Sequence, residues 1–364
     1  MRGLGSVLVC GVAAVLVGCS DPAPKESREP TAEPGTDLRD FQVADMLAEL
    51  PASLARRDDP FVFYAGDLAR ASELAGMPRP DALGETGSWI APLAGGDQDS
   101  FVYVPLDIPL APRYPAPLIA DDLHWSVLDV YRFASWTQVA QTTTVARGSF
   151  DDETLAELPS ADGIHTAGKG ADLKGDLASA SPARPQGIPL RMATSEDWLI
   201  ASPETPVVED WVAGAATLAD LPVLAELAAA LDENDVYAAV MTTPEPFGTI
   251  PLPPLVIEEL RLSDADFPRF IAYAVGWSVE DERAAMTVAY HLALGEDADR
   301  ARNQVADLWN GADFRLVPLS RIVEVDEVTT RDGVVAVRLS AESSDAAAQV
   351  AQMVDGGDLP FMTR

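Results

Sequence analysis

Cysteine is almost missing from this sequence. Cys10 and Cys19 are the only two among 364 residues, so no thiol follows residue 19. Disulfides, thiolate metal sites and a cysteine nucleophile are therefore excluded from the chain beyond that point. We expect the fold to depend on its hydrophobic core alone. That is feasible, because a chain of about 300 residues buries roughly three quarters of its unfolded surface.

Basic residues are also scarce. Lysine and arginine number 25 against 58 aspartates and glutamates, which gives a formal net charge of −33. Such a charge repels phosphate backbones and anionic lipid headgroups. We therefore expect no nucleic acid among the partners of this protein, and we interpret the acidity mainly as a property that keeps the chain soluble.

Histidines and catalytic motifs are few as well. His124, His165 and His291 are far apart, and no HExxH or paired-histidine spacing occurs, so we predict no metal site. A GxSxG elbow, an SxxK motif, a P-loop and a dinucleotide-binding glycine fingerprint are missing too. Adjacent acids such as Asp151 and Asp152 are common in turns and helix starts. The sequence therefore assigns no catalytic residue and no cofactor.

What the chain does have is a distinctive beginning. Arg2 precedes an uncharged apolar run over residues 4–17, which has the length of a signal peptide and is short for a bilayer crossing. The run ends in small residues followed by a cysteine, the ending that a signal peptidase requires. These residues are Leu16, Val17, Gly18 and Cys19.

This ending resembles the lipobox of bacterial membrane lipoproteins. The resemblance implies that residues 1–18 are a signal peptide and that Cys19 becomes a diacylglyceryl-cysteine at the start of the mature chain. The partner of that cysteine is then the lipid bilayer, and the protein is anchored at the extracytoplasmic face of the cell membrane. An uncleaved amino-terminal helix is the alternative interpretation of the same apolar run.

Residues 19–40 are predicted to be a tether. The stretch from residue 20 to 36 contains four prolines, mixed charges and no large apolar side chain. It cannot bury enough surface to offset the entropy of ordering, so we expect it to be disordered.

The remaining chain contains signs of an internal duplication. The segment LAELPASL at residues 47–54 returns as LAELAAAL at residues 224–231. A short β-like run follows each copy, at residues 61–64 and 236–240. Two hairpins and a helical stretch then follow in the same order in both halves, and five elements in one order are a stronger sign than composition alone. We place the first half at residues 41–216 and the second at 217–364.

The hairpins predict the fold class. Apolar runs interrupted by turn residues, such as VEVDEVTTRDGVVAVRL at residues 323–339, are typical of antiparallel strands. Together with amphipathic helices they predict an α+β protein of two related lobes, each a sheet with helices packed on one face. A helix is expected from Asp151, and one strand near residues 101–104 within an irregular insertion at residues 83–117.

A few residues are candidates for a ligand site. Trp89 lies among glycines, where an aromatic ring could cap a ligand or fix the segment to the body of the protein. A short segment near residue 120 combines two acids, a histidine and a tryptophan. These four residues are Asp121, Asp122, His124 and Trp125.

The sequence favours a non-enzymatic function. The lipobox and the missing catalytic motifs indicate a lipid-anchored lipoprotein with a binding or structural role in the envelope, whose partner is an unidentified protein or small molecule. One alternative is an envelope hydrolase, which would require two carboxylates about 5–9 Å apart in a pocket. The other is a carrier of apolar molecules, which would require a continuous apolar cavity.

Overall fold

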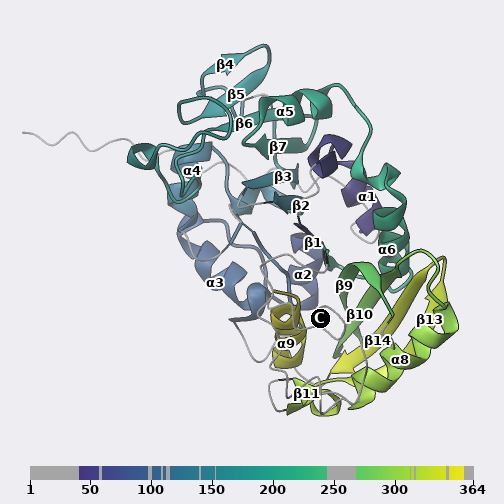
Figure 1. Cartoon of the computed structure of the whole chain (residues 1–364). Helices are drawn as coiled ribbons and strands as arrows, with labels where there is room; N and C mark the ends of the chain where they lie inside the picture. Colours follow the sequence, from purple (N-terminus) through teal and green to yellow (C-terminus); the bar gives the residue numbers. More distant parts are fainter. Residues whose placement is uncertain are drawn as a thin grey trace, which may run out of the picture. The chain divides into compact units, whose positions relative to one another are not determined.

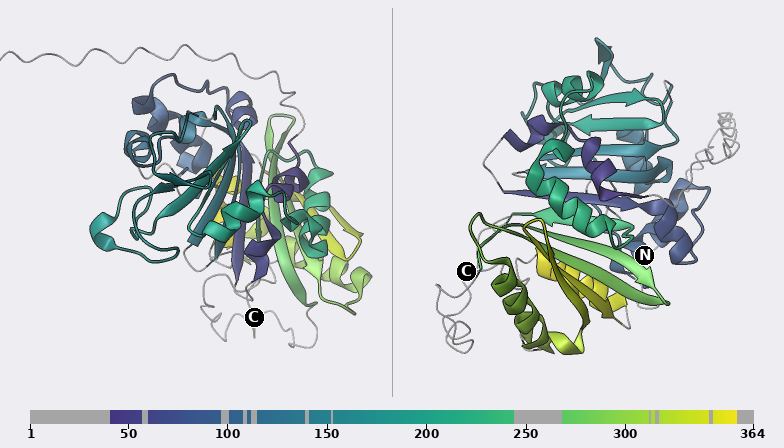
Figure 2. Two further views of the ribbon diagram at one scale, coloured as in Figure 1. Left: turned by 90° about the horizontal axis from the view of Figure 1, so that it is seen from above. Right: turned by 90° about the vertical axis from the view of Figure 1, so that its right-hand side faces the viewer.

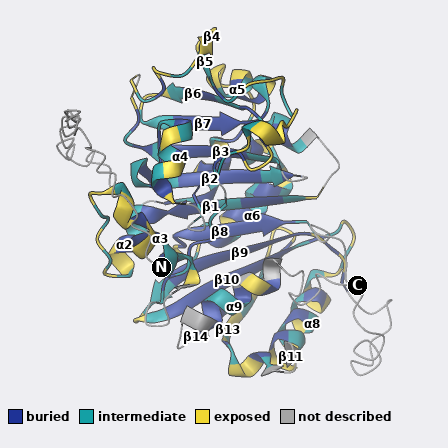
Figure 3. Cartoon of the chain, turned by 90° about the vertical axis from the view of Figure 1, so that its left-hand side faces the viewer, coloured by how far each residue is buried: buried dark blue, intermediate teal, exposed yellow. Residues whose placement is uncertain are grey.

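One antiparallel sheet of twelve strands organises the part of the chain that the structure describes (Figure 1). The computed structural model describes residues 41–56, 60–96, 101–107, 110–111, 115–138, 141–151, 153–243, 268–311, 313–314, 317–341 and 344–355. The strand order across the sheet is β13-β14-β10-β9-β8-β1-β2-β3-β7-β6-β5-β4. Figure 3 shows these strands stacked from β4 at one edge to β13 at the other, with buried residues along most of them.

The strands come in two sets along the chain. The first set is β1 (Phe61–Asp67), β2 (Val130–Gln138), β3 (Gln141–Gly148), β4 (Ser160–Ala161), β5 (Ile164–Ala167), β6 (Leu190–Ser195) and β7 (Trp198–Ser202). The second set is β8 (Ala238–Thr242), β9 (Phe270–Glu280), β10 (Arg283–Leu292), β13 (Glu324–Arg331) and β14 (Val334–Ala341). Two further strands, β11 (Asp313–Phe314) and β12 (Val317–Pro318), form a separate pair.

The two sets repeat one order. Outward from the centre of the sheet, β1-β2-β3-β7-β6 on one side corresponds to β8-β9-β10-β14-β13 on the other. At the centre β1 and β8 pair antiparallel, with Tyr64 opposite Val240. The predicted α+β class, with its antiparallel hairpins, is confirmed.

Two details of the prediction need correction. The halves do not form separate sheets, because β1 hydrogen-bonds to β8 and makes the sheet continuous. The helices also pack on both faces rather than on one. Trp136 of β2 and Trp277 of β9 belong to the hydrophobic clusters on the two opposite faces of the sheet. The boundary at residue 216 stays a prediction.

The helices divide between the two faces by the buried residues they contribute. On one face lie α1 (Val43–Ala48), α5 (Thr205–Val212) and α6 (Pro222–Asp232). On the other lie α2 (Leu68–Leu74), α3 (Thr86–Ala91), α4 (Ala116–Leu123), α8 (Ala298–Gly311) and α9 (Ser344–Asp355). The right-hand view of Figure 2 shows α1 and α6 against the same face of the sheet. None of the helices in the described ranges combines the length and apolar composition that a bilayer crossing requires.

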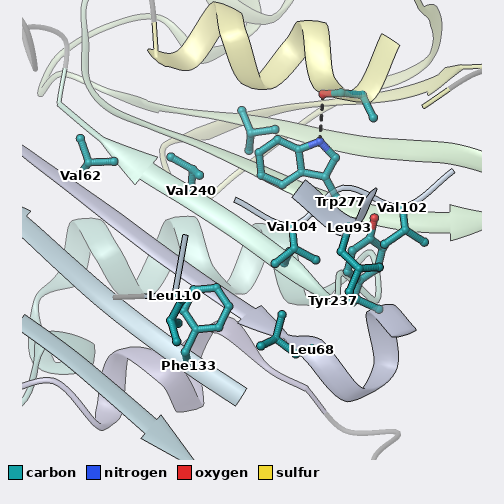
Figure 4. Packing of buried hydrophobic residues seen from close by; sticks show 14 of the residues in the cluster. Val62, Leu68, Leu93, Val102, Val104, Leu110, Phe133, Tyr237, Val240 and Trp277 are labelled. Carbon is teal, nitrogen blue, oxygen red and sulfur yellow. Dashed lines mark hydrogen bonds between the residues drawn. The ribbon is translucent and has the colours of Figure 1, made fainter. Parts of the chain in front are cut away.

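Large side chains fill the space between the sheet and the helices α2, α3, α4, α8 and α9 (Figure 4). The indole Nε1 of Trp277 donates to the carbonyl of Ala347 at 3.4 Å and so connects β9 to α9. A Cβ on Gly66 would lie 2.8 Å from the ring of Phe133, so β1 can pass this ring only with glycine at that position.

Two local predictions in the first half were wrong. Residues 153–157 form turns rather than a helix, because the Asp151 carboxylate accepts from the Glu153 backbone N–H and the Thr154 hydroxyl. Residues 101–104 form no strand. The backbone N–H of Val104 donates instead to the carbonyl of Leu93, across the insertion itself.

Asp232 connects the two halves and is expected to make stability depend on pH. Its carboxylate accepts from the backbone N–H groups of Val43 at 2.6 Å and Ala44 at 3.1 Å, at the start of α1. Burial, assisted by nearby Asp45 and opposed by the two N–H donors, raises the pKa of Asp232 to about 6. A raised carboxyl pKa stabilises the native state at low pH, and this contribution is lost as the pH rises through 6.

The Asp232→Asn variant should remove this dependence. Between about pH 4.5 and 7.5 the wild type should lose about 1–3 kcal/mol of unfolding free energy relative to the variant. Urea unfolding of both proteins at the two pH values measures the difference. If the difference in unfolding free energy between the wild type and the Asp232→Asn variant is the same at both pH values, Asp232 is not the group that causes the pH dependence.

Candidate functional site

Trp89 is an interior anchor. It lies in α3 rather than in an open loop, is 3% exposed, and donates from Nε1 to the Ser72 hydroxyl at 2.9 Å. The Arg79 guanidinium lies 5.1 Å from the centre of its ring. The ring therefore fixes α3 to the body of the protein.

The other predicted candidates lie at and after the end of α4, and each side chain has a different environment. Asp121 is exposed, whereas the Asp122 carboxylate accepts from Arg184 Nε at 2.9 Å and Nη2 at 2.7 Å. His124 has a left-handed backbone after the helix, and its Nδ1 lies 3.6 Å from a Glu157 carboxylate oxygen. Trp125 is 1% exposed and belongs to the core. The structure does not gather these side chains around one ligand.

The lipobox residues, Leu16, Val17, Gly18 and Cys19, lie outside the described residues. Within the described ranges, no group of three or more histidine, cysteine, aspartate or glutamate residues is arranged to hold a metal ion.

A cavity of about 320 Å³ lies where α1, the β6–β7 turn and the end of α5 meet. Three separate parts of the first half and the segment that follows it supply its walls. The lining residues are Ala48, Glu49, Pro51, Thr194, Ser195, Glu196, Trp198, Asp210, Trp211, Val212, Gly214, Ala215 and Thr217. We call this cavity the Trp198–Trp211 pocket.

Two tryptophans and three carboxylates give the pocket its character. Trp198 begins β7 and Trp211 lies in the last turn of α5, and both are only partly buried. Glu49, Glu196 and Asp210 also line the cavity, while none of the described lining residues is basic. Aromatic faces beside unbalanced negative charge are the groups that bind organic cations in proteins.

Local structure positions the two tryptophans. Ser195 and Trp198 are paired across β6 and β7, so Glu196 and Asp197 form a two-residue turn, with a left-handed φ of 55° at Glu196. The Asp197 carboxylate accepts from Arg147 Nε at 2.7 Å, and the Arg147 guanidinium lies 5.8 Å from the centre of the Trp198 ring. The Trp198 ring is thereby held in place, and it already has one cation beside it.

Glu49 is the least satisfied acid of the pocket. It follows α1 directly and is half-buried, and none of the described residues donates a hydrogen bond to its carboxylate or forms an ion pair with it. Burial raises the pKa of Glu49; Arg147 opposes this rise, and the charges of Asp45 and Asp197 add to it. A bound cation would add positive charge next to this carboxylate, beyond the charge of Arg147.

The sequence contains a signal for this pocket that our interpretation missed. The tripeptide Glu-Asp-Trp occurs twice, at residues 196–198 and 209–211, and both tryptophans line the cavity. A tryptophan directly after two acids is a poor core residue, and the repetition of this pattern within 16 positions could have identified the pair.

No family model matches the chain, and no curated protein matches it. Among solved structures, crystal form I of TP0453 is 9% identical with a TM-score of 0.37, and the match covers 85% of this chain and 97% of that chain. Crystal form III of TP0453 gives 9% identity and a TM-score of 0.36, covering 84% and 97%. At these values the similarity carries no conclusion about ligand or activity.

Proposed function

We propose that this protein is a lipid-anchored, non-enzymatic binding protein of the bacterial envelope that takes a small organic cation in the Trp198–Trp211 pocket. The observation that carries the proposal is the pocket itself, in which two indole rings and three carboxylates surround about 320 Å³. The lipobox resemblance supports the anchor, with Cys19 as the acylated residue at the extracytoplasmic face of the cell membrane.

The electrostatics of the pocket favour a cation over other ligands. A cation above an indole face gains about 0.5–2 kcal/mol, and the gain rises as the cation loses water. The half-buried Glu49 carboxylate adds attraction in a medium that screens less than bulk water. An anion would meet three carboxylates and a chain with a net charge of −33.

The first experiment is a titration of the full-length protein with choline, a quaternary ammonium cation of suitable size. Isothermal titration calorimetry and tryptophan fluorescence should both detect saturable binding. The uncharged isostere 3,3-dimethylbutan-1-ol has the same shape and should bind at least about tenfold more weakly. Equal affinities for both compounds would show that the positive charge does not contribute to binding. If neither compound binds, the pocket is not a site for quaternary ammonium cations.

Substitutions in the pocket should weaken choline binding selectively. Trp198→Ala removes one aromatic wall, and Glu49→Gln removes the half-buried charge, so each should raise the dissociation constant about tenfold. Glu209→Gln is the matched control, because Glu209 is exposed on α5 next to Asp210 and does not line the cavity. An equal loss in the Glu209→Gln protein would point to general charge attraction rather than to this pocket.

The other two functions remain predictions. An envelope hydrolase would cleave glycans or peptides with a pair of carboxylates, and a carrier would enclose apolar molecules between sheet and helices. The choline titration distinguishes both from the proposed function, since neither requires a cation.

A further inference from the structure

A second cavity lies on the opposite face of the sheet from the Trp198–Trp211 pocket. It has a volume of about 280 Å³ and shares no lining residue with that pocket. Ala201 of β7 lines it and belongs to the hydrophobic cluster under α2, α3, α4, α8 and α9. Trp198 packs against the cluster on the other face, because successive residues of a strand point to opposite sides. The two cavities are therefore separate.

One wall of this cavity is the face of the sheet. Thr137 of β2 is paired with Thr142 of β3, and Thr144 of β3 is paired with Ala201 of β7. Alternate residues of a strand share a face, so these four side chains lie on the same side of the sheet. All four line the cavity. Strand register thus places two partly exposed threonines, Thr137 and Thr142, next to each other on this wall.

Another wall comes from residues 183–188, which a buried ion pair holds in place. The Asp122 carboxylate accepts from Arg184 Nε at 2.9 Å and Nη2 at 2.7 Å, and from the Ser181 hydroxyl at 2.5 Å. The Arg184 side chain is only 6% exposed. Asp122, one of the candidates from the sequence, does not line the cavity but positions a segment that does.

Three oxygen-bearing side chains meet at one point of the walls. Thr137 Oγ1 donates to Asp107 Oδ2 at 2.5 Å, and Thr142 Oγ1 lies 3.2 Å from the same carboxylate oxygen. The two threonine hydroxyls are 2.9 Å apart. A hydroxyl that donates its proton to a carboxylate still has lone pairs that can accept. This part of the cavity therefore offers acceptors to a ligand that can donate.

Most of the other lining residues are apolar. They are Ala183, Pro185, Ile188, Leu190, Ala201 and Pro203. The two charged groups on the walls are engaged, Arg184 with Asp122 and Asp107 with the two threonines, so a neutral molecule fits this cavity better than an ion. Apolar walls with a few polar groups that orient the ligand are typical of small-molecule sites. An apolar cavity of about 150 Å³ holds benzene, so this volume is sufficient for a substituted ring.

We propose that this cavity is a second binding site, which takes a neutral molecule with an apolar body and a hydroxyl group. The hydroxyl donates to the Thr137–Thr142 pair, and the apolar body lies against Ile188 and Leu190. The site is independent of the Trp198–Trp211 pocket and of the cation proposed there. Ordered water is the competing occupant.

The test is a titration of the full-length protein, labelled with ¹³C in the isoleucine methyl groups, with benzyl alcohol. The Ile188 methyl resonance should shift saturably. The Ile200 methyl resonance should not move, because Ile200 is fully buried in the cluster on the other face of the sheet. An Ile188 resonance that does not move up to the solubility limit, or that moves without saturation, means water only and overturns the proposal.

A variant tests the hydroxyl recognition. Thr142→Val has a similar shape but lacks the acceptor, so it should weaken benzyl alcohol binding about fivefold. It should leave the affinity for ethylbenzene, which has a methyl group in place of the ligand hydroxyl, unchanged. Thr143→Val is the matched control, because Thr143 is the next residue of β3, bonds to the Ser202 hydroxyl at 2.9 Å and does not line this cavity. Unchanged benzyl alcohol affinity in the Thr142→Val protein, or an equal loss for both compounds, would overturn the proposal.

Discussion

Cys19→Ser is expected to move the protein from the membrane fraction to the soluble fraction. Two acyl chains on the cysteine sulfur contribute about 0.8 kcal/mol for each buried methylene, far more than the screened repulsion between an acidic protein and anionic headgroups opposes. Serine cannot receive the thioether, so this binding energy should be lost completely. Fractionation followed by intact-mass measurement of the native protein detects both the relocation and the loss of the acyl mass.

Cys10→Ser is the matched control, because Cys10 lies inside the segment that the lipobox resemblance assigns to the signal peptide. It should leave the location and the mature mass unchanged. A Cys19→Ser protein that stays embedded in the membrane would refute the anchor. A native chain that is unacylated and begins at another residue would refute it too.

Asp67→Ala is expected to lower the free energy of unfolding by about 3–5 kcal/mol. Asp67 is fully buried at the end of β1, where its carboxylate accepts from Arg132 Nε at 2.8 Å and from the backbone N–H of Arg70 at 2.8 Å. Alanine would leave the Arg132 guanidinium buried without a countercharge and would remove the N-cap of α2. Urea unfolding followed by circular dichroism at neutral pH measures the loss.

An exposed ion pair nearby provides the control. Arg70 also pairs with Asp235 at 2.5 Å, but the Asp235 side chain is 72% exposed, so Asp235→Ala should cost less than about 1 kcal/mol. Burial raises the pKa of Asp67, while the hydrogen bonds from Arg70 and Arg132 lower it. Asp67→Ala combined with Arg132→Met removes both desolvated charges and should recover at least half of the loss. Equal costs for Asp67→Ala and Asp235→Ala would contradict this account.

Local patterns in the sequence were sufficient for the hairpins. The run at residues 323–339 became β13 and β14, with Gly333 at a φ of 81° in the turn between them. Alternating apolar residues and a glycine turn specify such a hairpin without help from the rest of the chain. The α+β class and the repeated strand order follow from hairpins of this kind.

The candidate site was harder to predict from the sequence than the hairpins. The two Glu-Asp-Trp tripeptides are visible in the sequence, and their shared pattern could have been read there. Glu49 could not, since nothing around it distinguishes it from the other acids of the chain. It joins the tryptophans only because α1 and α5 pack on the same face of the sheet.

The sequence by itself determined hairpins such as β13–β14, because turns and strand alternation are set by neighbouring residues. Only the tertiary structure decided that β1 pairs with β8, which faces of the sheet the helices cover, and that Glu49 joins Trp198 and Trp211 in one pocket. The β1–β8 pairing and the place of Glu49 depend on contacts between residues more than 140 positions apart, which no local pattern records.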